Sequence, residues 1–387
     1  MTTTTTETQT KETFHFINNS SDAINEALTG LTEHNPYLSY SPTHKIVYRS
    51  DLDTFRNDHV TSIGCSGGGH GGKLNLADTM IHHKHSEPMF SGFVGHNFLS
   101  AYVSGSVFAS PTARQMFEAI KMCQPEKGQS KGTLLVVGNY TGDILNAGLA
   151  ITRATAAGYN VRLVPVGDDV AVGRKKGGKV GRRGLSGHLI ALKCACALAQ
   201  KGESLERVAE VTEYVAENVG TIGVAFDRVA LPNDIVTELQ TLPPDTVELG
   251  MGAHGEPGLQ QISPVPSPQE LTKKMIKLLT DMSDSDRAFI PFSGNKGEDE
   301  VVLLLNSLGS TSDEVLAKFA ELGIEELESQ GLKVNRLTLG PLVTSLKMSG
   351  FGFTVWRLPA VGEKSPLGRE EALKLWDEPV EVVAWRQ

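Results

Sequence analysis

The sequence has few cysteines, no long apolar run and no excess of basic residues. Its cysteines lack the paired spacing of a zinc site; they are Cys65, Cys123, Cys194 and Cys196. No apolar stretch approaches the ~20 residues that span a bilayer, and the N-terminus has no secretory signal. The formal net charge of −9 is opposite in sign to that of most nucleic-acid-binding domains. We therefore expect a cytoplasmic protein with reduced thiols, and with neither a membrane nor a nucleic acid as its partner.

The length and the pattern of apolar residues predict α/β architecture. A chain of 387 residues, 40% hydrophobic and 21% charged, is typical of a globular protein with two or three domains. The runs Thr133–Val137 and Val301–Leu305 are continuous and apolar, as in buried parallel strands. Repeated units of strand, loop and helix favour two α/β domains with mixed sheets flanked by helices.

Three parts are predicted along the chain. A Thr-rich tail, residues 1–19, is expected to be disordered. An N-terminal α/β domain covers residues 20–220, and a C-terminal α/β domain covers residues 221–387. The first domain contains an apolar helical pattern at Leu185–Lys201, in which Cys194 and Cys196 are expected to pack in the core.

The segment Glu248–Gly258 is the strongest candidate for a functional loop. It contains four glycines, one histidine and a proline, with a carboxylate on each side of the histidine. Glycine permits positive φ and close approach of a ligand, and proline fixes the exit turn. The segment is therefore predicted to be a loop that presents His254. The alternative is an ordinary Gly-rich turn with a surface histidine.

Two further loops follow predicted strands. The strand at Thr61–Cys65 runs into Ser66–Gly72, whose glycines can bring backbone amides against a ligand, although the run matches neither the P-loop nor the dinucleotide fingerprint. The strand at Thr133–Val137 runs into Gly138–Asp143, at the edge where open α/β sheets bind ligands. Asp143 is there either a catalytic base or the N-terminal cap of the next helix.

Several histidines are close together in the sequence, which raises the possibility of a metal site. They are His70, His82, His83, His85 and His96. Their spacing matches no regular ligand pattern, so we predict no metal site.

Eight segments together resemble the dihydroxyacetone kinase family, and specifically its substrate-binding K subunit or domain. They are Ser66–Gly69, Phe108–Thr112, Asn139–Asp143, Asp168–Val172, Gly181–Gly184, the His254 loop, Asn306–Gly309 and Leu375–Asp377. Their order covers the chain from about residue 20 to the end. The resemblance implies two α/β domains and a homodimer.

The resemblance also implies a covalent mode of substrate binding. In that family, the histidine that matches His254 adds to the ketone carbon of dihydroxyacetone and holds it as a hemiaminal. The aspartate that matches Asp143 assists at a substrate hydroxyl. The predicted substrate-binding residues come from the Gly-rich turn, the segment after it and two other loops: Gly67, Gly68, Gly69, Ser86, Phe108, Ser110 and Gly138.

The sequence departs from the family pattern at the general base. In the family, three residues (Ser-Gly-His) separate the triple glycine from Glu-Pro. Here 17 residues, the insert segment 70–86, separate Gly69 from Glu87-Pro88, an insertion of 14. Ser86 takes the place of the catalytic histidine when the segments are aligned from Glu-Pro, and His70 and His85 lie nearby as candidate catalytic residues. Gly138 occupies the position of a lysine in the family pattern, and Phe90 occupies the position of a later histidine.

These departures lead to three hypotheses of function. The first is a carbonyl-processing enzyme that captures a small ketone or aldehyde at His254 and performs non-phosphorylating chemistry, such as enolisation, isomerisation, aldol-type reaction or condensation. The second is the K subunit of a dihydroxyacetone (glycerone) or ketose kinase, a transferase that obtains ATP and Mg²⁺ only through a separate L-type subunit. We expect no cofactor in this chain. The third is a catalytically inactive carbonyl sensor.

Overall fold

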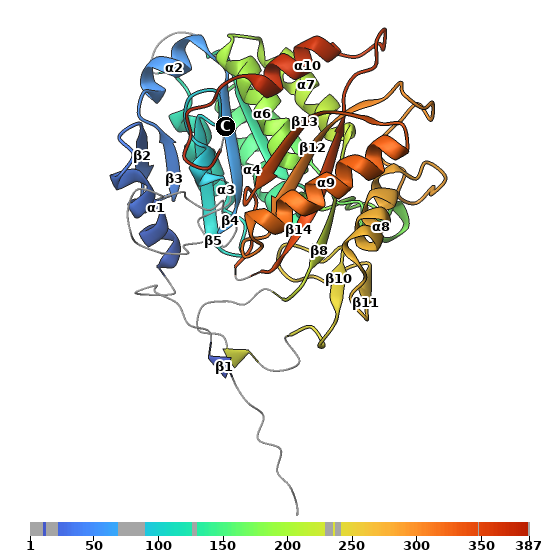
Figure 1. Ribbon diagram of the computed structural model, residues 1–387. Helices are drawn as coiled ribbons and strands as arrows, with labels where there is room; N and C mark the ends of the chain where they lie inside the picture. The colour runs from blue at the N-terminus through green and yellow to red at the C-terminus, as the bar shows by residue number, and fades with distance from the viewer. Residues whose placement is uncertain are drawn as a thin grey trace, which may run out of the picture.

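The computed structural model describes residues 11–12, 22–68, 90–125, 130–228, 235–236, 241–346 and 348–385. These residues form two six-stranded sheets, each flanked by helices (Figure 1). The predicted fold class, two α/β units with mixed sheets, is therefore confirmed. Within the described ranges, no helix is long and apolar enough to cross a membrane.

The first sheet has the strand order β2-β3-β5-β4-β6-β7. The strands β5, β4, β6 and β7 are parallel to one another, and β3 pairs antiparallel with both β5 and β2. The bounds are β2 (Leu38–Ser41), β3 (Ile46–Arg49), β4 (Thr61–Gly68), β5 (Ala101–Val107), β6 (Thr133–Gly138) and β7 (Val161–Val166). Every residue of β6 is buried, as expected for a parallel strand covered by helices on both faces.

Helices cover this first sheet on both faces. They are α1 (Ala23–Glu33), α2 (Leu52–Asp58), α3 (Ala113–Met122), α4 (Thr141–Ala156), α6 (Gly187–Gln200) and α7 (Leu205–Glu217), with the 3₁₀ turn η1 at Ser91–Phe93. The short helix α5 (Arg174–Gly177) instead contacts the second unit, where the Arg174 side chain donates to the carbonyl of Ser285. The helix α3 begins with a capping box between Thr112 and Gln115, which satisfies two of the backbone N–H groups at its start.

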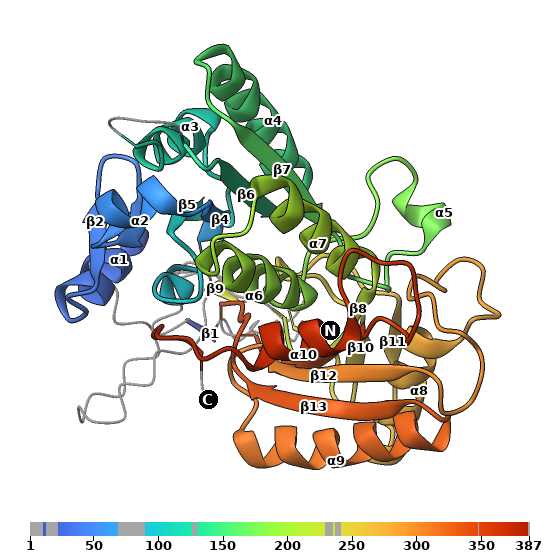
Figure 2. The same ribbon diagram turned by 90° about the horizontal axis from the view of Figure 1, so that it is seen from above.

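The second sheet has the order β11-β10-β8-β14-β12-β13 and is mainly antiparallel, with β12 and β13 parallel. Its strands are β8 (Val219–Ala225), β10 (Val247–Leu249), β11 (Gln260–Ile262), β12 (Glu300–Ser307), β13 (Lys333–Gly340) and β14 (Gly350–Arg357). The helices α8 (Pro268–Thr280) and α9 (Asp313–Ser329) pack on one face of it, and α9 lies along β13 in Figure 2.

The helix α6 lies between the two sheets (Figure 2). It contacts β4, β6 and β7 of the first sheet and β8 and β14 of the second. Every residue from Gly187 to Ala199 is buried, so this helix has no solvent-facing side. Cys194 and Cys196 are fully enclosed there, as predicted. One hydrophobic cluster accordingly includes residues from both sheets.

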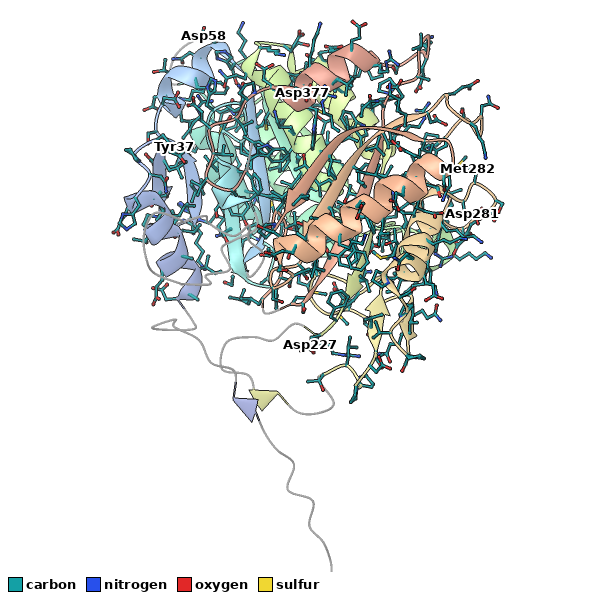
Figure 3. The ribbon with its side chains drawn as sticks, viewed as in Figure 1. Tyr37, Asp58, Asp227, Asp281, Met282 and Asp377 are labelled. Carbon is teal, nitrogen blue, oxygen red and sulfur yellow. The ribbon has the colours of Figure 1, made fainter. Side chains whose placement is uncertain are left out.

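The last segment of the chain returns to the first unit. The helix α10 (Arg369–Asp377) packs against α6, and the buried Lys193 ammonium donates to the carbonyl oxygens of Leu375 (3.2 Å) and Glu378 (2.5 Å). Asp377, at the end of α10 in Figure 3, pairs with Arg336 of β13 at 2.7 Å. Beyond the helix, the Ala384 amide donates to the carbonyl of Gly92 at 2.9 Å.

The predicted tail and the predicted insert lie wholly or mostly outside the residues that the structure describes. Of the predicted disordered tail, only Lys11–Glu12 is described; it forms β1, which pairs antiparallel with β9 (Ile235–Val236). The insert 70–86 lies outside the described residues. The predicted boundary at 220/221 falls within β8, and the division into two independent domains stays a prediction.

Candidate functional site

A cavity of about 250 Å³ opens where the two units meet. It lies at the carboxyl ends of β4 and β6 and at the N-terminal ends of α4 and α6, and the loop after β10 closes it from the second unit. The residues around it are Cys65, Ser66, Gly67, Phe90, Phe108, Ser110, Gly138, Tyr140, Thr141, Gly142, Asp143, Gly184, His188 and His254. Its volume is below the usual range of drug-sized pockets, so it suits a small metabolite.

The loop that carries His254 is held in one conformation by contacts from both units. Gly250 and Gly255 have φ of 77° and 79°, in a backbone region that residues other than glycine rarely adopt. The Glu248 carboxylate accepts the Gly258 amide at 2.6 Å, and the Ser345 hydroxyl donates to the carbonyl of Ala253. From the first unit, Arg183 donates to the Gly250 carbonyl at 2.8 Å.

The orientation of the His254 ring is set by a carboxylate and two aromatic rings. Nδ1 of His254 lies 2.9 Å from Oε1 of Glu256, and the His254 backbone amide donates to Oε2 of the same carboxylate at 2.9 Å. Phe108 and Tyr140 stand perpendicular to the ring, with centroids at 5.3 and 5.2 Å. A carboxylate can only accept, so Nδ1 carries the proton and the lone pair of the neutral ring is on Nε2.

The electrostatics of this pair favour a reactive imidazole. Burial alone would raise the pKa of Glu256, but the hydrogen bond from His254 and the charge of that ring lower it to about 2. Glu256 is therefore ionised at neutral pH. Its negative charge stabilises positive charge on the ring, as a triad aspartate does for its histidine.

Asp143 has the properties of a proton acceptor. It is only 6% exposed, and burial raises its pKa to about 6, against the lowering effect of a hydrogen bond from Ser110 at 2.7 Å. Its second oxygen, Oδ1, is buried without a hydrogen-bond partner among the described residues. The N-cap of α4 is Tyr140, so the alternative interpretation of Asp143 as the helix cap is wrong.

The backbone after β4 and β5 approaches the cavity closely. Phe108 has φ of 51°, which is unusual for a bulky residue and occurs mainly at functional sites. Its amide donates to the carbonyl of Gly68 at 2.9 Å. A Cβ atom on Gly67 would lie 3.0 Å from the Ala109 nitrogen, so a larger residue at position 67 would push the two segments slightly apart.

The structure brings six of the predicted site residues together at the cavity: His254, Asp143, Gly67, Phe108, Ser110 and Gly138. Gly68 belongs to the end of β4 and is not among the cavity residues. Four other predicted residues, Gly69, His70, His85 and Ser86, lie outside the described residues. The described ranges contain no group of three or more His, Cys, Asp or Glu side chains that could hold a metal ion.

Three residues of the candidate site were not predicted from the sequence: Glu256, Tyr140 and His188. Glu256 is one of the two carboxylates noted beside His254, and its short separation from the histidine was the available signal. Tyr140 lies in the predicted loop Gly138–Asp143, in which only Gly138 and Asp143 were predicted as site residues. His188 follows a glycine inside an apolar helical pattern, and nothing in that pattern indicates that its ring faces a cavity.

Comparison with known proteins identifies the family. The model of the Dak1 domain matches residues 29–384. This chain belongs to the Dak1 domain family. The family resemblance predicted from eight segments is thereby confirmed.

Curated relatives of this Dak1 domain include kinases of yeast and mammals. Dihydroxyacetone kinase 2 of Saccharomyces cerevisiae is 37% identical over 363 residues, covering 93% of this chain and 56% of the yeast protein. Human triokinase/FMN cyclase is 33% identical over 369 residues, covering 95% of this chain and 57% of the human protein. The chain thus spans about half the length of the curated relatives that it matches.

Two solved structures resemble this Dak1 domain over nearly its whole length. The dihydroxyacetone kinase of C. freundii has a TM-score of 0.74 at 28% identity, covering 98% of this chain and 61% of the kinase chain. The dihydroxyacetone kinase operon co-activator Dha-DhaQ has a TM-score of 0.75 at 26% identity, covering 93% of this chain and 97% of the co-activator chain. The fold is therefore shared by a protein called a kinase and one called a co-activator.

Proposed function

We propose that this Dak1 domain captures a short hydroxyketone or hydroxyaldehyde, of the dihydroxyacetone type, by a covalent bond to Nε2 of His254. The observation that carries this proposal is the His254–Glu256 pair at the edge of a cavity of about 250 Å³. An imidazole whose Nδ1 proton is held by a carboxylate has its nucleophilic lone pair on Nε2. The names of the relatives support the choice of ligand class.

The capture step conserves atoms and charge. The Nε2 lone pair forms a bond to the carbonyl carbon, the π electrons move to the carbonyl oxygen, and that oxygen takes up a proton from solvent. The positive charge that develops on the ring faces Glu256. When the Nδ1 proton is released to solvent, the adduct is a neutral hemiaminal. Covalent capture selects carbonyl compounds over polyols of the same size.

Asp143 is proposed to act on a hydroxyl group of the captured ligand. Its pKa of about 6 lies near neutral pH, where a general base is most effective. It would accept the hydroxyl proton as that oxygen becomes a nucleophile toward a phosphoryl donor. This is the chemistry of a kinase acceptor site, with the nucleotide and Mg²⁺ supplied by a partner domain or subunit.

The chemistry of the adduct favours phosphoryl transfer to a ligand hydroxyl over enolisation or aldol-type reaction. Addition of His254 makes the carbonyl carbon tetrahedral, which removes the electron sink that carbanion chemistry at the neighbouring carbon requires. The non-phosphorylating hypothesis is therefore not the one that the site favours. Capture without phosphoryl transfer, as in a sensor, is an outcome of the experiment below.

The experiment is NMR of [2-¹³C]dihydroxyacetone with the intact chain and with His254→Ala. We expect the carbonyl signal to move to the tetrahedral region with the wild type and to stay in the ketone region with the variant. Mg-ATP and an L-type kinase subunit are then added, and phosphate esters are followed by ³¹P NMR. A ketone signal unchanged by the wild type contradicts covalent capture, and an adduct that accepts no phosphate contradicts the kinase role. The homodimer and the cytoplasmic location stay predictions.

A further inference from the structure

The helix α6 brings a second imidazole to the same cavity. His188 is only 1% exposed, yet its ring lies among the residues around the cavity. Nε2 of His188 is buried and has no hydrogen-bond partner among the described residues. Buried polar atoms in folded proteins are nearly always paired, so an unpaired one calls for an explanation.

The two unpaired atoms at this cavity occur on different elements. Eight buried side-chain polar atoms lack a partner within the described ranges, and two of them, Oδ1 of Asp143 and Nε2 of His188, belong to residues around this one cavity. Asp143 comes from the first turn of α4 and His188 from the first turn of α6. A small ligand with two hydroxyl groups would provide a partner for each.

The position of His188 is fixed by its surroundings. The buried Asp168 carboxylate accepts the amides of Leu185 (2.6 Å) and Gly187 (2.8 Å), which holds the start of α6. A Cβ atom on Gly187 would lie 2.7 Å from that carboxylate, so position 187 must be glycine for the start of α6 to lie this close to Asp168.

The His188 ring is enclosed by its neighbours as well. The ring of Phe90 meets it edge-on, with centroids 4.7 Å apart. A Cβ atom placed on Gly138 would lie 3.7 Å from Nδ1 of His188, so this part of the ring is in van der Waals range of the Gly138 backbone. The ring is therefore held in place without a hydrogen bond to Nε2.

The chemistry of this imidazole suits an uncharged ligand group. Burial lowers the pKa of His188 to about 3, so the ring is neutral at physiological pH. A neutral imidazole has one N–H donor and one lone pair, and either can bond to a hydroxyl, which both donates and accepts. It offers no positive charge to a carboxylate or a phosphate.

We propose that Nε2 of His188 forms a hydrogen bond with one hydroxyl of the ketone captured at His254, while Asp143 binds the other hydroxyl. This inference rests on the proposed function and adds to it a specificity: the site selects ketones with hydroxyl groups on both sides of the carbonyl over ketones with one. His188 is thus a ligand-binding residue that discriminates dihydroxyacetone from hydroxyacetone.

The test combines two ligands with three variants of the full chain. Dissociation constants for dihydroxyacetone and hydroxyacetone are measured by calorimetry with the wild type, His188→Leu, His188→Met and His188→Gln. The leucine and methionine variants remove the hydrogen bond, and the glutamine amide retains a polar group near the position of Nε2. We expect leucine and methionine to weaken dihydroxyacetone binding about tenfold, as one lost hydrogen bond predicts, with little change for hydroxyacetone and partial recovery in the glutamine variant.

A stability measurement separates this role from a structural one. Replacing an unpaired buried nitrogen by an apolar group should leave the melting temperature of the ligand-free protein unchanged or raise it. A lower melting temperature, together with an equal loss of affinity for both ligands, would show that His188 merely supports the cavity.

The capture at His254 can fail independently of the role of His188. If the wild type binds dihydroxyacetone without a tetrahedral NMR signal and the His188 variants still discriminate the two ligands, covalent capture is wrong and the hydrogen bond stands. If the tetrahedral signal forms and the variants do not discriminate, the hydrogen bond is wrong and capture stands. No binding of either ligand by the wild type overturns both.

Discussion

Replacing Asp143 by asparagine is expected to stabilise the folded protein at neutral pH while weakening the binding of its ligand. Burial raises the pKa of Asp143 from 3.8 to about 6. A carboxyl group whose pKa is higher in the folded than in the unfolded state destabilises the folded state when it ionises. This destabilisation is absent below the unfolded pKa and complete above the folded one.

The size of the effect follows from that difference in pKa. At 1.36 kcal/mol per pH unit, the step from 3.8 to about 6 corresponds to about 3 kcal/mol at pH 8. About half of it is already present at pH 5. The free energy of unfolding of Asp143→Asn should therefore exceed that of the wild type by about 1.4 kcal/mol more at pH 8 than at pH 5.

Urea unfolding of the ligand-free protein at pH 5, 6, 7 and 8 measures this difference. Asp58→Asn, which changes an exposed aspartate of α2, is the matched control and should show no comparable increase with pH. Ser110→Ala should move the pH dependence of the wild type upward, because the Ser110 hydrogen bond lowers the pKa of Asp143. A stability difference between Asp143→Asn and the wild type that is constant from pH 5 to 8 would refute the reasoning.

Further predictions concern the histidine partner, the thiols and two ion pairs. Glu256→Gln should weaken dihydroxyacetone capture by up to about 100-fold, because a hydrogen bond to a charged group contributes about 1.5–3 kcal/mol; a dissociation constant unchanged by calorimetry would contradict the role of Glu256. The variant should also lose pH-dependent stability, since a carboxyl group with a lowered pKa stabilises the fold above its unfolded pKa of 4.5 and ceases to do so as pH falls toward about 2. The buried thiols, whose pKa values are raised by burial, should react with Ellman's reagent only after unfolding, and rapid labelling of the native protein would contradict their enclosure; they are Cys65, Cys123, Cys194 and Cys196. Arg357→Ala should cost about 3 kcal/mol of unfolding free energy, because it leaves the buried Asp299 carboxylate without its cationic partner. Arg336→Ala removes an exposed pair with Asp377 and should cost less than about 1 kcal/mol, so equal losses in the two arginine variants would contradict the comparison.

The fold was predictable from sequence where one element is apolar throughout or regularly periodic. The predicted strand Thr133–Val137 ends one residue before β6 does, and the predicted helical pattern Leu185–Lys201 contains the whole of α6. The strand β5 was missed because Ala101–Val107 mixes small and polar residues, and its burial comes from its place between β3 and β4. Its pairing with β3 and β4 in the folded protein makes this segment a strand, and the local sequence pattern alone does not predict that pairing.

The site was predictable where residue type and loop composition point to chemistry. His254 and Asp143 were predicted, one from its Gly-rich loop and the other from its place after a buried strand. His188 was not, since a histidine in an apolar helical pattern gives no sign of which face meets a cavity. Its ring lies beside Gly138 and Phe90, which are distant from it in sequence.

The enclosure of α6 has a consequence for how the protein is made. During synthesis, α6 is complete before β8 and β14 have been translated, so the side of the helix that they cover stays exposed in the nascent chain. Hydrophobic surface left exposed in this way favours aggregation and binding by chaperones. The cavity also needs the His254 loop, which is translated later still. Binding of a ligand in the cavity would therefore require that both sheets have packed against α6. Fragments that end before β8 are expected to be insoluble.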